Sequence, residues 1–346
     1  MLYNPDTPSS ALLPYLDKRF GPGAPAVESA LANASRILPI ITTGHATSAG
    51  NNTYWPEVYL NQSLIDGDHP GPYRDTPVPR VFGNVSPLDP QLFSRINDFA
   101  DELLKGEISG KYSPIEVAQW LEDYAARATD SLAQAEKLSI GRSRPEYRRI
   151  AIDVAIQSRI GTFFAARFRS AVLYRIYQQT GDNRTFDESL RKYREARSAW
   201  AEIVDISKPV YNPDITIGEH PQLRGHWADR LPAIDADVAL LAKQAESPRQ
   251  SERDASKAIQ AALGRPSRNP LACNHVPAPP FHAGQPVPIA LTAAKGLGSF
   301  IGSPVLSAGH SSRALPVRGY GIQGWRLSRH DRWRLHQFSL SARILF

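Results

Sequence analysis

Residues 87–264 carry apolar side chains at helical spacing, and this pattern constrains the fold more than any other feature of the chain. The string Ser113-Pro114-Ile115-Glu116 predicts a helix start, because the serine can cap the first turn, proline suits that turn and the glutamate can reach back to the cap N–H. Ile115, Leu121 and Leu132 then keep one apolar face along the predicted helix.

Further helices are predicted on both sides of this one. A long segment opens at Pro145 and ends at Gly181, and Asp182-Asn183 begin the turn into the next helix. A shorter helix is predicted from Pro90 to Leu104, and another follows Pro232. Four or five antiparallel helices with short links form a bundle, so the sequence predicts an all-α fold.

The remaining segments lack this period and suggest a division of the chain into five parts. Residues 42–86 are rich in Gly, Asn, Asp, Pro and tyrosine, and residues 266–288 hold seven prolines. The predicted parts are an N-terminal helical segment (1–41), a long aromatic and polar loop (42–86), the helical bundle (87–264), a proline-rich linker with a candidate first β-strand at Pro288–Thr292 (265–295), and a basic tail (296–346).

The net positive charge of the chain comes from the tail alone. Residues 296–346 contain seven arginines, no lysine and one acid, whereas residues 1–295 hold 33 basic and 33 acidic side chains. A basic face for nucleic acid should lie on the folded domain, so nucleic acid is not an expected partner. The abrupt change in composition and the loss of any hydrophobic period favour a tail that is translated out of frame and is disordered, or an incomplete β-type module.

Composition also excludes several classes of protein. The single cysteine, Cys273, rules out a disulfide framework and a cysteine-built metal cluster, and no His or acid pair has a metal-ligand spacing. We therefore expect no metal and no cofactor. No apolar run approaches the ~18 residues of a membrane span, so no membrane association is predicted. The N-terminus lacks the pattern of a secretory signal, and the chain as written is expected in the cytoplasm.

One string in the loop has the chemistry of a saccharide-binding site. Residues 51–59, NNTYWPEVY, combine aromatic rings that can stack on the C–H face of a sugar with amides and a carboxylate that can bind hydroxyl groups. The other interpretation is structural, with Trp55 and Tyr59 anchoring the loop on the bundle. The candidate substrate-binding residues are Tyr3, Asn4, His45, Asn51, Asn52, Tyr54, Trp55, Glu57 and Tyr59.

The N-terminal strings resemble one family. Tyr3-Asn4-Pro5-Asp6, a helix ending at Lys18-Arg19-Phe20-Gly21 and a second helix to Leu38 resemble the exit from the catalytic (β/α)8 barrel of large bacterial glycoside hydrolases, especially α-glucuronidase-like enzymes. The later string Tyr193-Arg-Glu-Ala196 with Trp200 resembles their C-terminal helical region. In that family the catalytic carboxylates lie at barrel strand ends. No barrel pattern precedes residue 87, so no catalytic residue is assigned here.

Three functions follow from these observations. The first is a fragment of a carbohydrate-active enzyme that supplies a helical domain and a loop contacting an oligo- or polysaccharide, without catalytic activity of its own. The second is a free-standing helical binding or interaction protein with no enzymatic activity. The third is an independent hydrolase acting through carboxylates of the loop, such as Glu57.

Overall fold

The computed structural model describes residues 13–45, 63–65, 81–107, 109–214, 225–245 and 253–266, together with the backbone of four short strands between residues 273 and 314. The chain divides into two compact units. The first comprises Met1–Glu107 and Tyr112–Pro266, and the second comprises Ile108–Lys111 and Ser267–Phe346. All the helices described below belong to the first unit.

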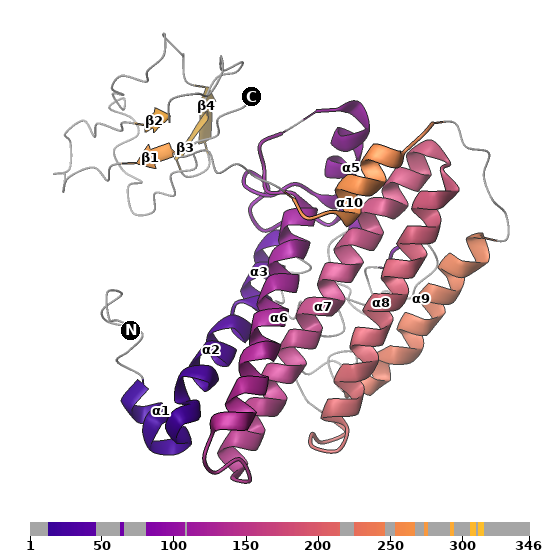
Figure 1. Cartoon of the computed structure of the whole chain (residues 1–346). Coiled ribbons are helices and arrows are strands. Elements are labelled where there is room, and N and C mark those ends of the chain that lie inside the picture. Colours follow the sequence, from indigo (N-terminus) through magenta and orange to yellow (C-terminus); the bar gives the residue numbers. More distant parts are fainter. Residues whose placement is uncertain are drawn as a thin grey trace. The chain divides into compact units, whose positions relative to one another are not determined.

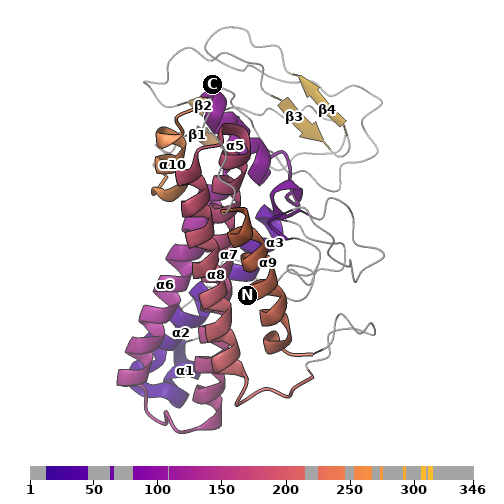
Figure 2. The same cartoon turned by 90° about the vertical axis from the view of Figure 1, so that its right-hand side faces the viewer.

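Three long helices form the centre of the first unit. Helices α6 (Pro114–Leu138), α7 (Pro145–Thr180) and α8 (Asn183–Ser207) lie side by side in Figure 1, and α7 packs against both of the others. Short turns join them, so successive helices run antiparallel. Figure 2 shows the same helices from the side. The predicted all-α antiparallel bundle is confirmed.

Shorter elements surround these three helices. Helices α2 and α3 pack against α6, helices α5 and α10 pack against α7, and helix α9 packs against α8. None of the described helices is long and apolar enough to cross a membrane. Their bounds, with those of the short 3-10 turns, are α1 Leu13–Phe20, η2 Gly21–Gly23, α2 Ala24–Ala34, α3 Ile37–Gly44, η3 Phe82–Asn84, α5 Ile96–Lys105, η5 Trp227–Arg230, α9 Leu231–Gln244 and α10 Ser256–Leu263.

The helix ends follow the local chemistry of the sequence. The hydroxyl of Ser113 accepts a bond from the Glu116 N–H at 3.1 Å, and the Glu116 carboxylate accepts from the Ser113 N–H at 2.8 Å, which completes the predicted capping box. Gly181 ends α7 with a φ of 67°, a left-handed conformation that glycine adopts without strain. The Asp182 side chain then caps α8.

One predicted boundary differs from the structure. The sequence places the start of the shorter helix at Pro90, whereas α5 begins at Ile96. The reason is a local turn: the Asp89 carboxylate accepts hydrogen bonds from the N–H groups of Gln91 and Leu92. Aspartate side chains often divert the backbone in this way, and they compete with helix formation.

The core is centred on α7 and α8. Trp200 is fully buried, its ring lies 4.8 Å from that of Phe163, and its indole N–H donates to the carbonyl of Trp227 at 2.9 Å. Tyr193 and Phe168 are also fully or almost fully buried. Burying aromatic side chains of this size contributes much of the stability of a domain.

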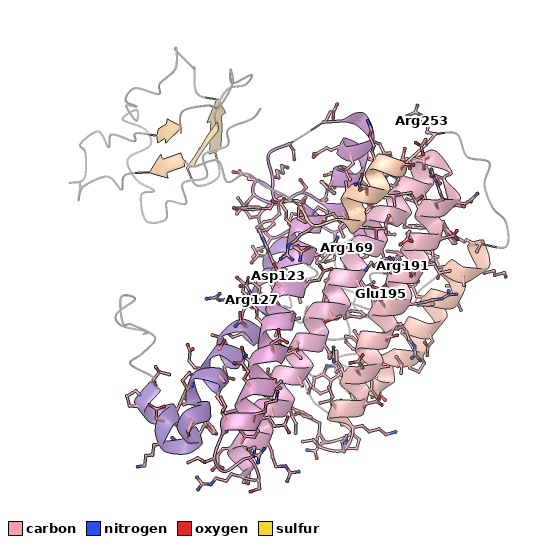
Figure 3. The ribbon with its side chains drawn as sticks, in the orientation of Figure 1. Asp123, Arg127, Arg169, Arg191, Glu195 and Arg253 are labelled. Atoms are coloured by element: carbon pink, nitrogen blue, oxygen red, sulfur yellow. The ribbon has the colours of Figure 1, made fainter. Side chains whose placement is uncertain are left out.

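A buried arginine attaches α10 to the bundle (Figure 3). The guanidinium of Arg169 on α7 pairs with both carboxylate oxygens of Glu122 on α6, at 2.7 and 2.9 Å. It also donates to the carbonyls of Ala262 and Gly264 at the end of α10, at 2.8 and 3.0 Å. The last carbonyls of a helix lack hydrogen-bond donors within the helix, and Arg169 supplies donors to two carbonyls at the end of α10.

The second unit contains two short antiparallel strand pairs. Strand β1 (Cys273–His275) pairs with β2 (Leu291–Ala293), and β3 (Val305–Ala308) pairs with β4 (Ser311–Ala314). The predicted strand at Pro288–Thr292 overlaps β2 in part. Strands β3 and β4 fall within the predicted tail of residues 296–346, and the rest of that tail lies outside the described residues, so its shifted reading frame and disorder stay predictions.

Candidate functional site

Most of the predicted saccharide-binding residues lie outside the described residues. This applies to Tyr3 and Asn4 and to the loop residues Asn51, Asn52, Tyr54, Trp55, Glu57 and Tyr59. His45 lies within the described part, as do Ser63–Ile65 and residues 81–86. These residues flank the segments 46–62 and 66–80 in the sequence.

The ends of both segments meet at Phe82. The Nε2–H of His45, at the end of α3, donates to the Phe82 carbonyl at 2.9 Å. The Phe82 N–H donates to the carbonyl of Ser63 at 3.0 Å, and Ser63 and Val81 form a parallel bridge. We call His45, Ser63–Ile65 and Val81–Phe82 the loop stem. The stem thus brings residues 45, 63 and 82 together.

Burial sets the chemistry of His45. Its side chain is 1% exposed and its ring lies 4.1 Å from that of Phe82. Burial, together with the nearby Arg167 guanidinium, lowers the pKa of His45 to about 4, so the imidazole is neutral at pH 7. These contacts favour a structural role for His45 in the stem, rather than direct contact with a sugar.

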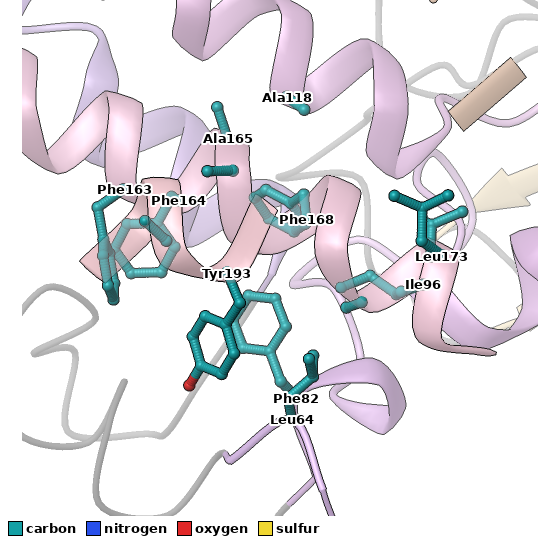
Figure 4. Packing of buried hydrophobic residues seen from close by; sticks show 14 of the residues in the cluster. Leu64, Phe82, Ile96, Ala118, Phe163, Phe164, Ala165, Phe168, Leu173 and Tyr193 are labelled. Carbon is teal, nitrogen blue, oxygen red and sulfur yellow. The ribbon is translucent and has the colours of Figure 1, made fainter. Parts of the chain in front are cut away.

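The stem packs against the buried core of the bundle, where Leu64 and Phe82 of the stem lie near Tyr193 of α8 (Figure 4). The guanidinium of Arg167 on α7 is fully buried and lies 4.2 Å from the centre of the Phe82 ring. The phenol of Tyr193 on α8 donates to Oδ2 of Asp237 on α9. The Leu64 N–H donates to the same carboxylate oxygen at 3.3 Å. Three helices therefore hold the two segments of the stem, Ser63–Ile65 and Val81–Phe82.

A polar pocket opens next to the stem. Its volume is about 270 Å³, and its residues come from the chain that follows the stem, from α5 and from the end of α7. Amide and carboxylate groups predominate among its lining residues, which are Val81, Asn84, Asn97, Asp98, Asp101, Arg175 and Gln178. Amides and carboxylates are groups that bind sugar hydroxyls. One lining residue of the pocket, Val81, also belongs to the stem.

Hydrogen bonds order part of this pocket and leave part of it free for a ligand. The Asn97 amide donates to Asn84 Oδ1 at 2.5 Å. Asp101 accepts two bonds from Arg175, at 2.9 and 2.8 Å. The exposed Gln178 side chain makes no hydrogen bond with another described residue. The pocket can therefore offer at least one amide to a hydroxyl-bearing ligand.

Sequence reasoning missed this pocket. Its residues lie at positions 81–101 and 175–178, and no motif connects them. The one available signal was the string Ile96–Lys105, whose polar face carries Asn97, Asp98 and Asp101 at helical spacing. Within the described part of the chain, no group of three His, Cys, Asp or Glu side chains is arranged to hold a metal ion.

Comparisons with known proteins give a relationship in structure only. Searches with family models and against curated proteins found no match. Among solved structures, the chain is similar to a "GH138 enzyme targeting pectin rhamnogalacturonan II", with a TM-score of 0.53 and 14% sequence identity. The match covers 70% of this chain and 36% of that protein. About 70% of this chain thus shares its fold with about a third of that enzyme.

Proposed function

We propose that this chain acts as the helical domain of a carbohydrate-active enzyme of the glycoside hydrolase type. In this role the polar pocket and residues Asn51–Tyr59 both contact an oligo- or polysaccharide. Hydrolysis itself would need carboxylates supplied by a barrel domain. The observation that carries the proposal is the fold shared with a GH138 enzyme over 70% of this chain.

The finer part of the proposal concerns the place of this domain in its enzyme. The strings at Tyr3–Asp6 and Lys18–Gly21 resemble the exit from the barrel of α-glucuronidase-like enzymes. The fold similarity to 36% of a larger enzyme is consistent with a domain that accompanies others. We therefore propose that this chain follows a catalytic barrel and that residues of its loop contact the sugar.

The polar pocket supports saccharide contact but not acid–base catalysis. Glycoside hydrolysis requires one carboxyl group that protonates the leaving oxygen and another that acts as nucleophile or base. Asp98 bonds Arg95 through both oxygens, at 2.7 and 3.0 Å, and Asp101 bonds Arg175 in the same way. Carboxylates engaged in two bonds to arginine are suited to order a pocket rather than to exchange protons with a substrate.

Calorimetric titration with pectin-derived and neutral oligosaccharides tests saccharide binding at the pocket. Because a single open wall covers only one side of a sugar, we expect dissociation constants of roughly 1 mM. Gln178→Ala should weaken binding severalfold, since it removes the free amide of the pocket. Gln134→Ala, which changes another exposed glutamine, on α6, should have no effect. Equal saccharide affinities for the two variants would show that the pocket does not bind saccharide.

A hydrolysis assay tests the non-catalytic part of the proposal. The purified chain should release no product from aryl-glycosides. Turnover that Glu57→Gln abolishes would contradict this expectation and would establish the chain as an independent hydrolase acting through its loop.

The alternative is a helical interaction protein without enzymatic activity, and one surface favours it. Leu138 and Ile140, at the turn between α6 and α7, are 52% and 54% exposed although both are large and apolar. Exposed apolar residues that lie close together often mark a protein interface. Analytical ultracentrifugation of the Leu138→Ser/Ile140→Ser variant tests this role. Self-association that this variant abolishes, combined with no saccharide binding, would favour the alternative.

A further inference from the structure

A second pocket lies at the start of α7, far from the loop stem. Its volume is about 510 Å³, within the range of ordinary small-molecule sites. Arg149 in this pocket and Arg175 in the polar pocket are 26 positions apart on one helix, which corresponds to roughly 40 Å. The pocket therefore belongs to a different region of the molecule.

One face of α7 forms most of this pocket. The lining residues Pro145, Arg148, Arg149, Ile152 and Asp153 recur at the three- and four-residue intervals that share a helix face. The segment after α8 supplies the opposite side with Val210 and Tyr211. Two guanidinium groups thus share a hollow with an apolar surface.

The charges of the two arginines are only partly balanced in the pocket, where Asp153 is the single acidic lining residue. Neither Arg148 nor Arg149 forms an ion pair with a described acidic side chain, and both are exposed. An anion bound between them would relieve the repulsion between the two positive charges.

Tyr211 and Asp153 hold the opposite side of the pocket in place. The Tyr211 hydroxyl donates to Asp153 Oδ1 at 2.6 Å, and the tyrosine ring meets Trp227 edge-on at 5.2 Å. Burial and this carboxylate raise the pKa of Tyr211 to about 12, so the phenol stays neutral. The second oxygen of Asp153 remains able to accept a hydrogen bond from a hydroxyl group of a ligand.

The charges of the pocket indicate what it binds. Two guanidinium groups and one carboxylate leave one net positive charge, which a monoanion neutralises and a phosphate dianion would exceed. A planar carboxylate matches the guanidinium fork, and Ile152 with Val210 offers an apolar surface for a ring. We infer that this pocket binds a ring compound that carries a single carboxylate. This inference does not depend on the proposed role in saccharide contact.

Ligand-observed NMR titration of the full chain tests this inference with two carboxylates that differ in their rings. Glucuronate represents a sugar acid and benzoate an aromatic acid, and glucose and benzyl alcohol are their uncharged counterparts. We expect at least one acid to bind with a dissociation constant near 1 mM and its uncharged counterpart to bind at least tenfold more weakly. The acid that binds more tightly identifies the kind of ring.

Arginine variants assign the binding to this pocket. Arg148→Gln/Arg149→Gln should weaken the acid at least tenfold. The control Arg127→Gln/Arg194→Gln, which removes two exposed arginines from α6 and α8, should leave the affinity unchanged and keeps the same net charge. Both variants should retain the helical circular dichroism of the parent chain. Equal affinity for the two variants, tighter binding of inorganic phosphate than of either acid, or no binding of either acid would overturn the inference.

Discussion

The phenol of Tyr193 on α8 donates a hydrogen bond to Oδ2 of Asp237 on α9, and both side chains are fully buried. The same carboxylate oxygen accepts from the N–H of Leu64, a residue of the loop stem. One buried acid therefore connects two helices of the bundle to the segment that precedes residues 66–80. Breaking this connection should loosen the stem as well as destabilise the bundle.

Removal of the phenol tests this connection. Tyr193→Phe leaves a buried carboxylate with one hydrogen bond fewer, and the free energy of unfolding should fall by about 1–3 kcal/mol. Urea denaturation followed by circular dichroism measures the change. The control Tyr15→Phe alters a tyrosine that is 61% exposed and should be neutral. If both variants unfold at the parent midpoint, the Tyr193–Asp237 bond does not contribute to stability.

The buried imidazole of His45 predicts a dependence of stability on pH. The pKa of His45 is lowered from 6.5 to about 4 in the folded chain, so the unfolded chain binds a proton more readily. The stabilisation is fully present above pH 6.5 and is lost as the pH falls toward 4. The difference corresponds to about 3 kcal/mol.

Urea denaturation at pH 7 and at pH 4.5 measures this loss. In His45→Gln, which keeps a donor for the Phe82 carbonyl but does not titrate, the decrease between the two pH values should be smaller than in the parent chain. An equal decrease in the two proteins would show that His45 does not titrate on unfolding.

A second pH effect comes from the junction of α8 and α10. Bonds from Ser256 and Arg184 lower the pKa of Asp254 to about 2, and Arg184 also lowers the pKa of Asp182. Carboxyl groups with a lowered pKa stabilise the fold above their ordinary pKa near 3.8, and this stabilisation disappears as the pH falls toward 2.

Melting temperatures of Arg184→Gln and of the parent chain test this effect. The variant should melt lower at pH 7, and the two melting temperatures should converge as the pH approaches 2. Arg127→Gln, which removes an exposed arginine from α6, should follow the parent curve throughout. Parallel curves for Arg184→Gln and the parent chain would contradict the predicted linkage.

Gly83 determines the shape of the polar pocket. A Cβ atom at this position would lie 2.2 Å from Asn97 Oδ1, so Gly83→Ala must displace the Asn97 side chain and break its bond to Asn84. Because the displaced group is the end of a side chain, we expect a stability loss of no more than about 1 kcal/mol. Saccharide affinity should fall severalfold in calorimetric titration.

The double variant Gly83→Ala/Asn97→Ala separates the two effects. It removes the steric conflict, so it should regain the parent stability, but it lacks the amide and should bind saccharide as weakly as the single variant. Parent affinity in Gly83→Ala would show that the arrangement of Asn97 is irrelevant to binding.

Local sequence signals were sufficient to predict most of the bundle. The capping box at Ser113, the end of α7 at Gly181 and the cap at Asp182 each depend on residues within a few positions, and all three are confirmed. The predicted start of α5 at Pro90 was wrong because the turn at Asp89 competes with helix formation. The limits of the five predicted segments stay predictions.

The candidate site could be predicted only in part, since it depends on contacts between distant residues. The 51–59 string was identified from its composition, but the pairing of Tyr193 with Asp237 joins positions 44 apart. The arginine at position 169 reaches residues 93 and 95 positions away. No periodicity in a single sequence specifies such partners, because they follow from how the helices pack.

The central claim is that the loop with residues 51–59 contacts saccharide. A titration followed by tryptophan fluorescence tests this contact directly. Acidic and neutral oligosaccharides are added to the parent chain, to Trp55→Ala and to Trp120→Phe, which alters a tryptophan of α6 that contacts Tyr112. We predict a weak saturable change in the parent chain and in Trp120→Phe, and none in Trp55→Ala. A response that Trp55→Ala leaves unchanged would contradict the account and would make the loop tryptophan a structural anchor.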